Sequence, residues 1–231
     1  MSLINKLFGS KTSEENNTIP FIENDIDKSD AAIKADPLMA YNKRLELNPK
    51  DFDALYFRGN EKSKMADYAG AIEDYTKTLK LNPKFTDALF NRAIAKRKSE
   101  DMRGALQDYT LAISLNPSFA LAFNNRGIIK REIGNYGGAV DDYNRAIELN
   151  PNFDEAFVNR GISRDEYKNH IGAIEDYNEA IVLNPQNAAA YNNRGFAKFN
   201  CGDQDGAYLD WSKAAELGLT EGNDNIKKYC K

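Results

Sequence analysis

The chain has 231 residues, a net charge of −4 at pH 7 and a hydrophobic fraction of 42%. This acidic balance lacks the basic surface typical of nucleic-acid-binding proteins, so we expect no nucleic-acid partner. No apolar stretch reaches the roughly 18 residues that a membrane-spanning helix needs, so we do not expect membrane insertion.

The content of metal-binding and redox residues is low. Two cysteines and one histidine are too few for a disulfide framework or for a four-ligand zinc site made of Cys and His. We therefore predict no metal, no cofactor and a reducing, cytoplasmic location.

Residues 1–19 are predicted to be a flexible arm with a short amphipathic start. Its apolar residues Leu3, Ile4, Leu7 and Phe8 have helical spacing. Two interpretations stay open, namely packing on the chain's own repeats or a weak anchor to a membrane or a partner. Ser2 excludes N-myristoylation, which needs glycine after the initiator Met. The apolar start is also too short and too interrupted for a signal peptide.

The remainder of the chain is built from repeats. Asn-Pro pairs end at Pro49, Pro83, Pro117, Pro151 and Pro185, 34 residues apart each time. A fixed period of this size predicts stacked supersecondary units that bury their apolar faces on their neighbours. We predict a partial repeat at 20–51, full repeats at 52–85, 86–119, 120–153, 154–187 and 188–221, and a capping segment at 222–231.

Each full repeat has the pattern of two helices, here called helix A and helix B, with positions numbered from 1. Position 8 is small, position 20 is Ala, and position 24 is aromatic (Tyr75, Tyr109, Tyr143, Tyr177 and Trp211). Small residues let two helices approach closely, while the ring fills the space between them. An Asp or Asn near position 16 separates the helices, and the Pro at position 32 ends helix B.

This pattern resembles the tetratricopeptide repeat (TPR) over residues 52–221. The resemblance implies an all-α, right-handed α-solenoid of helix-turn-helix units whose concave groove is lined by helix A. Three positions depart from the family pattern. Position 4 is Leu, Phe or Tyr rather than Trp, position 7 is Arg rather than Leu, and position 11 is Lys or Arg rather than Tyr.

Those departures include a recurring set of charges. Arg at position 7 and Lys or Arg at position 11 share one face of helix A, and every repeat has Asp at position 23 of helix B. We expect the cations to bind this carboxylate within a repeat or across to the next, because the Arg fork matches a carboxylate. Recurrence in every repeat favours ion pairs that set helix register over a local ligand site.

Position 6 of helix A is the candidate ligand contact. It resembles the asparagine ladder of the O-GlcNAc transferase superhelix, which holds an extended peptide by its backbone. A side-chain amide offers an acceptor and two donors, as a peptide bond does. A purely structural role for these asparagines stays open. The predicted peptide-binding residues are Asn91, Asn125, Asn159 and Asn193 at position 6, and Tyr56, Phe90, Asn124 and Asn192 at position 5.

Other sites are not supported. The family's clamp for acidic chaperone tails needs cations where this chain has Tyr56, Leu121 and Asn125. His170 lies in a turn without a nucleophile or metal ligand beside it, and we expect Cys201 to be a packed or inert thiol. We therefore predict a non-catalytic protein–protein interaction scaffold that binds a peptide or helix. The alternative is a self-associating or membrane-recruited assembly factor that uses the N-terminal segment.

Overall fold

The computed structural model describes residues 36–229, which form α-helices and, within that range, contain no strand. The described residues divide into two compact bodies, one ending at Ile129 and the other beginning at Lys130. The predicted amphipathic segment with Leu3 and Phe8 lies outside the described residues, and so does the first part of the partial repeat.

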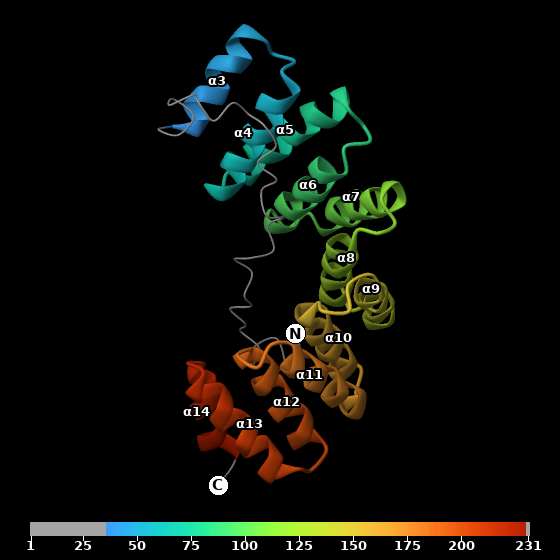
Figure 1. Ribbon diagram of the computed structural model, residues 1–231, viewed down its shortest axis with the longest axis vertical. Coiled ribbons are helices and arrows are strands. Elements are labelled where there is room, and N and C mark those ends of the chain that lie inside the picture. The colour runs from blue at the N-terminus through green and yellow to red at the C-terminus, as the bar shows by residue number, and fades with distance from the viewer. Residues whose placement is uncertain (1–35, 230–231) are drawn as a thin grey trace. The chain divides into compact units, whose positions relative to one another are not determined.

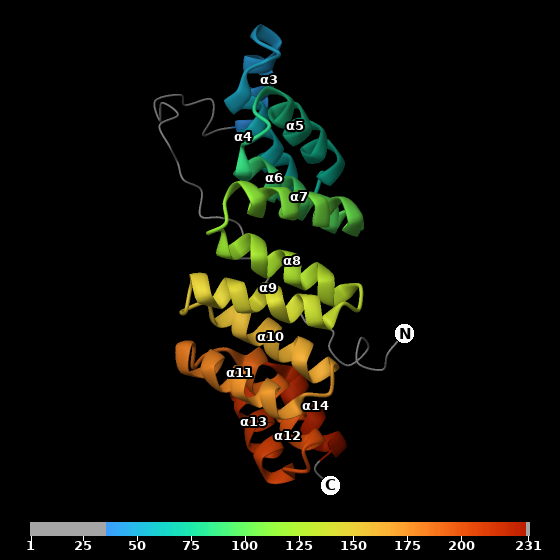
Figure 2. The same cartoon turned by 90° about the vertical axis from the view of Figure 1, so that its right-hand side faces the viewer.

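The first body is a series of helices in which, from α3 to α7, each packs on the next one along the chain. Figures 1 and 2 show this succession from the first labelled helix onward. Its helices are α3 (Pro37–Leu47), α4 (Phe52–Lys64), α5 (Tyr68–Leu81), α6 (Thr86–Lys98), α7 (Met102–Leu115) and the larger part of α8 (Ala120–Glu132).

The second body follows the same rule, with consecutive helices packed on one another from α9 to α14 (Figure 1). The predicted all-α fold of paired helices is confirmed. The helices of the second body are α9 (Tyr136–Leu149), α10 (Asp154–Glu166), α11 (His170–Leu183), α12 (Ala188–Asn200), α13 (Gln204–Glu216) and α14 (Thr220–Tyr229).

Side-chain caps explain where helix B begins in each repeat. The predicted Asp or Asn near position 16 is the residue before the helix, and its side-chain Oδ1 accepts a hydrogen bond from the backbone N–H three residues later. This satisfies one of the free donors of the first turn. The capping residues are Asp67, Asp101, Asn135, Asn169 and Asp203.

The core of each repeat depends on close contact between position 8 of helix A and the ring at position 24 of helix B. The rings of Tyr75, Tyr177 and Trp211 are at most 1% exposed. A Cβ placed on Gly161 would lie 2.7 Å from Cε1 of Tyr177, closer than real contacts allow. The ring therefore occupies the space that a side chain at position 8 would need.

The turn between helix A and helix B has a recurring left-handed residue. Ala66, Glu100 and Lys168 have φ of 60°, 65° and 68°, while Gly134 and Gly202 fill the same position in other repeats. The backbone N–H of the following residue donates a hydrogen bond to a carbonyl in the last turn of helix A, as Asp67 N does to Lys62 O at 2.9 Å. This is the Schellman motif, in which glycine avoids the strain that a Cβ causes.

The last helix, α14, covers the end of the second body. Its Asn225 donates a 2.8 Å bond to the buried Asn192 of α12, and the Tyr229 ring lies 5.6 Å from the Trp211 ring. A polar helix that covers an apolar repeat end is the device that terminal repeats use against association. The boundaries predicted for the repeats and the cap stay predictions.

Replacing Glu100 or Lys168 with Gly is expected to raise the free energy of unfolding by about 0.5 to 1 kcal/mol, because glycine removes the left-handed strain. Urea unfolding measures the change. The reverse substitution, Gly134→Ala, is expected to lower stability by a similar amount. Destabilisation by Glu100→Gly would contradict this interpretation of the turn.

Gly161→Ala is expected to destabilise the protein by about 2 kcal/mol, since the new methyl group overlaps the buried Tyr177 ring. Gly137→Ala is the control, because a Cβ there meets no atom within 4 Å. It should be neutral or stabilising by up to about 1 kcal/mol, as alanine favours helix. Equal melting temperatures for the two variants would contradict the assigned contact.

Candidate functional site

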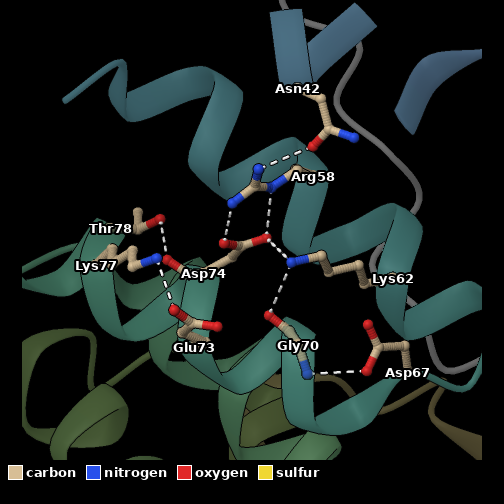
Figure 3. A network of polar contacts seen from close by, with 9 residues as sticks. All are labelled: Asn42, Arg58, Lys62, Asp67, Gly70, Glu73, Asp74, Lys77 and Thr78. Atoms are coloured by element: carbon tan, nitrogen blue, oxygen red, sulfur yellow. Dashed lines mark hydrogen bonds and ion pairs between the residues drawn. The ribbon is translucent and has the colours of Figure 1, made fainter. Parts of the chain in front are cut away.

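The recurring charges form a closed cluster in the first repeat (Figure 3). Asp74 is fully buried, and its two carboxylate oxygens accept bonds from Arg58 Nη2 at 2.6 Å and Nε at 2.8 Å. Lys62 Nζ lies 2.8 Å from the same carboxylate and also points to the carbonyl of Gly70. The predicted pairing within a repeat is therefore confirmed here.

The same cluster of Arg at position 7, a cation at position 11 and Asp at position 23 recurs along the chain. All distances from the cations to the carboxylate oxygens lie between 2.6 and 3.1 Å. The further clusters are Arg92, Lys96 and Asp108; Arg160, Arg164 and Asp176; and Arg194, Lys198 and Asp210. In the third repeat, Lys130 binds Asp142 at 2.8 Å.

Each arginine of the cluster also binds the helix B that precedes it, through its remaining Nη1. Arg160 Nη1, for example, donates a 2.7 Å bond to Asn144, and the acceptor always lies 16 residues earlier. The acceptors are Asn42, Thr76, Thr110, Asn144 and Asn178. One guanidinium thus joins its own helix A to the helix B on either side.

This geometry accounts for the cations at positions 7 and 11, and in the last three repeats the arginine also stacks on the ring at position 4. The Arg160 guanidinium lies 5.3 Å from the centre of the Phe157 ring at position 4, and Arg194 lies 5.4 Å from the Tyr191 ring. Stacking of Arg on an aromatic face is favourable and replaces the apolar contact usual at position 7. The donors and acceptors of the cluster bind one another, which favours a structural role over ligand binding.

Partner charges also shift the pKa of the buried carboxylate. Burial alone raises the pKa of Asp74, but the bonds from Arg58 and Lys62 outweigh it and leave that pKa below its usual range. Asp74 is therefore ionised at neutral pH, as its partners require.

The position 6 asparagines differ in exposure and in hydrogen bonding. Asn91 and Asn159 are half-buried, whereas Asn125 and Asn193 are each 8% exposed. The Asn193 amide makes no hydrogen bond with any described residue, although most of the side chain is buried. An amide without a protein partner and with an accessible edge is available to a ligand.

Asn91 takes part in a network within the protein. Its Nδ2 donates to Tyr56 Oη at 3.1 Å and to Asn60 Oδ1 at 3.0 Å, and Asn60 also accepts a 2.7 Å bond from Tyr75 Oη. Burial and the Asp87 carboxylate raise the pKa of Tyr56 to about 12, against the effect of its amide neighbours. Tyr56 therefore stays protonated at neutral pH, and the amide donors of Asn91 are already used.

Three of the four position 5 residues are packed inside the protein. Phe90 and Asn124 have no exposed surface, and the Phe90 ring lies 4.9 Å from that of Phe119. Asn192 is 9% exposed and holds Asn225 of α14. These residues fill the repeat interface, so ligand contact at position 5 is left to Tyr56.

Sequence reasoning missed the roles of Asn60 and Asn225. Asn60 stands at position 9, where most other repeats have Ile. A polar residue at a position that is apolar in the other repeats could have indicated its role. Asn225 lies beyond the last full repeat, and no spacing rule connects it with Asn192.

The remaining polar candidates have ordinary surroundings. His170 is half-buried, but it is the first residue of α11 rather than part of the turn in which the sequence placed it, and its Nδ1 contacts Asp165 Oδ1. Cys201 is exposed. Over residues 36–229, no three His, Cys, Asp or Glu side chains converge as metal ligands. None of the described helices combines the length and apolar character needed to cross a membrane.

Comparisons with known proteins identify the repeats. A family model described as "Tetratricopeptide repeat" matches residues 52–85 and another with that description matches 120–153, while one described as "TPR repeat" matches 169–202. The search of curated proteins found no match.

Solved structures with similar folds include two proteins. A crystal structure of MamA is 26% identical and has a TM-score of 0.66, covering 77% of this chain and 94% of its own. A MamA structure from Desulfovibrio magneticus RS-1 is 19% identical, with a TM-score of 0.67 and coverage of 72% and 95%. YrrB, described as a TPR protein with an unusual peptide-binding site, is 20% identical, with a TM-score of 0.67 and coverage of 82% and 99%.

The charge cluster predicts a pH dependence of stability. Because the folded-state pKa of Asp74 is lowered, its contribution is complete above the usual value of about 4 and is lost as the pH falls through the lower folded-state pKa. Asp74→Asn should cost about 3 kcal/mol at pH 7, since two cations lose their partner. Its unfolding free energy should also fall less steeply between pH 5 and pH 3.

Urea unfolding at a series of pH values measures both effects. Asp53→Asn, which changes an exposed carboxylate of the same repeat, is the control and should follow the wild type. An Asp74→Asn variant with wild-type stability at neutral pH would show that the cluster does not hold the helices.

Proposed function

We propose that this chain, which belongs to the tetratricopeptide-repeat family, is a non-catalytic scaffold that binds a peptide or helix of a partner protein along its helix A face. The contact residues of the proposal lie on α10 and α12, which touch each other directly within the second body. A cytoplasmic location remains part of the proposal.

The observation that carries this proposal is the unpartnered amide of Asn193. The side chain is 8% exposed, so its amide reaches the surface while most of the residue is held in place by packing. A peptide backbone offers the complementary donor and acceptor in one plane, so it would satisfy both ends of the amide. Asn159 stands at the same position one repeat earlier and is half-buried.

The sequence variation around these asparagines also supports a specific ligand. Position 9 of the same face is Ile162 in the fourth repeat and Phe196 in the fifth, and the latter is 8% exposed. Polar groups that fix orientation beside apolar side chains are the usual composition of a binding surface. The fold likeness to YrrB is compatible with this use but extends only to the fold.

The two bodies contribute differently to the proposal. In the first body, the donors of Asn91 are held by Tyr56 and Asn60, so its carbonyl oxygen is the group left for a ligand. Asn125 is 8% exposed, so only a small part of its side chain is accessible to a ligand. Binding is therefore expected to depend more on Asn193 than on Asn91.

An affinity capture from the source cell extract tests the proposal, with wild type compared with Asn159→Ala/Asn193→Ala. We expect the double variant to lose at least one partner that wild type retains, with a decrease of about tenfold or more in its recovered amount. The control is Asn152→Ala/Asn223→Ala, which removes two exposed amides elsewhere in the second body.

The three proteins are to be matched in melting temperature before the capture. Loss with the test variant and retention by the control would support a ligand on the helix A face. Equal retention by all three would make the position 6 asparagines framework residues and remove the basis of the proposal.

A further inference from the structure

The outer face of α11 carries an exposed stripe that is unlike its surroundings. Ile171, Glu175, Glu179 and Val182 follow one another at helical spacing, so they share one face of the helix. Ile171 is 70% exposed and Val182 is 73% exposed. Both glutamates are exposed, and neither makes a hydrogen bond or ion pair with a described residue.

Three of the corresponding helices, α5, α9 and α13, carry an ion pair of their own on this face. On α5, Lys77 binds Glu73 at 2.7 Å. On α9, Arg145 binds Glu148 at 2.8 Å, and on α13, Lys213 binds Glu216 at 3.0 Å. In contrast, α11 contains no lysine or arginine, and apolar residues stand at both ends of its acidic pair. The outer face of α11 therefore lacks the compensating cations that α5, α9 and α13 have.

A surface pocket lies beside this stripe. Arg160 and Arg164 both bind Asp176, so the carboxylates of Glu175 and Glu179 are the unpaired charges at its wall. Three carboxylates against two guanidinium groups leave the lining net negative. The pocket is lined by Arg160, Arg164, Glu175, Asp176, Asn178 and Glu179.

We propose that the outer face of α11 is a second docking surface, which takes an amphipathic helix from a partner protein that carries two basic side chains between apolar ones. The apolar side chains of that helix contact Ile171 and Val182, and the basic side chains pair with Glu175 and Glu179. The four residues of the stripe lie on helix B, and neither they nor the pocket lining include Asn159 or Asn193 of the helix A face.

The dimensions and charges fit such a partner. Val182 lies eleven positions after Ile171, so the stripe is about 16 Å long and matches about three turns of a partner helix. Amphipathic helices bind through apolar residues at this spacing. Exposed carboxylates affect mainly the rate of association and the choice of partner. Salt screens such charges, so binding is expected to weaken as the salt concentration rises.

A synthetic helical peptide of about four turns is the probe, with leucine at both ends of one face and two lysines between them. A second peptide has glutamate in place of both lysines. Fluorescence anisotropy of labelled peptides with the full chain is expected to show binding of the lysine peptide, weakened about tenfold or more in the glutamate peptide. Equal binding of both peptides, or none, would overturn the proposal.

Variants then locate the binding. Glu175→Lys/Glu179→Lys should weaken the lysine peptide about tenfold and improve the glutamate peptide. The control Asp141→Lys/Asp224→Lys makes the same change in net charge at two exposed positions outside α11 and should bind as wild type does. Equal weakening by both variants would reveal unspecific charge attraction and overturn the assignment.

A third variant separates the apolar contribution. Ile171→Ser/Val182→Ser changes two exposed side chains and should leave the melting temperature close to wild type, while it weakens the lysine peptide several-fold. Unchanged affinity would show that the apolar ends of the stripe take no part, which contradicts the proposal. None of these variants touches Asn159 or Asn193, so the result is independent of the helix A face.

Discussion

The buried carboxylate at position 23 is the constraint on which the repeats depend. A carboxylate such as Asp74, with no exposed surface, is tolerated only when cations and hydrogen bonds compensate for its lost hydration. Arg58 and Lys62 supply that compensation from helix A, and the arginine also reaches Asn42 on the preceding helix. Three helices are therefore fixed in register by one ion cluster, and the apolar contacts follow from that register.

Packing of the rings at position 24 is the apolar counterpart of this cluster. The ring of Tyr177 fits against Gly161 only if α10 and α11 are held at one rotation and one distance, which the bonds from Arg160 and Arg164 to Asp176 enforce. The polar cluster and the small-residue contact thus lie side by side on the same helix pair. Because the charged groups of the cluster already bind one another, we expect partners to bind other faces of the repeat.

Two faces remain for partners, and they have different chemistry. The proposed helix A face offers side-chain amides, which would recognise the backbone of a ligand with little regard for its sequence. The proposed outer face of α11 offers acidic and apolar groups, which would select a partner by its side chains. If both proposals hold, two partners would bind at once, as a scaffold requires.

Much of the fold was predictable from local rules. Helix starts follow from capping residues such as Asp67 and Asn169, and the pairing of Arg58 with Asp74 follows from positions that recur every repeat. Exposure of single asparagines was not predictable. Asn192 and Asn193 are neighbours in the sequence, yet Asn192 binds Asn225, 33 residues away, while the Asn193 amide makes no hydrogen bond with any residue that the structure describes. That outcome depends on how the helices rotate when they pack, which only the tertiary structure decides.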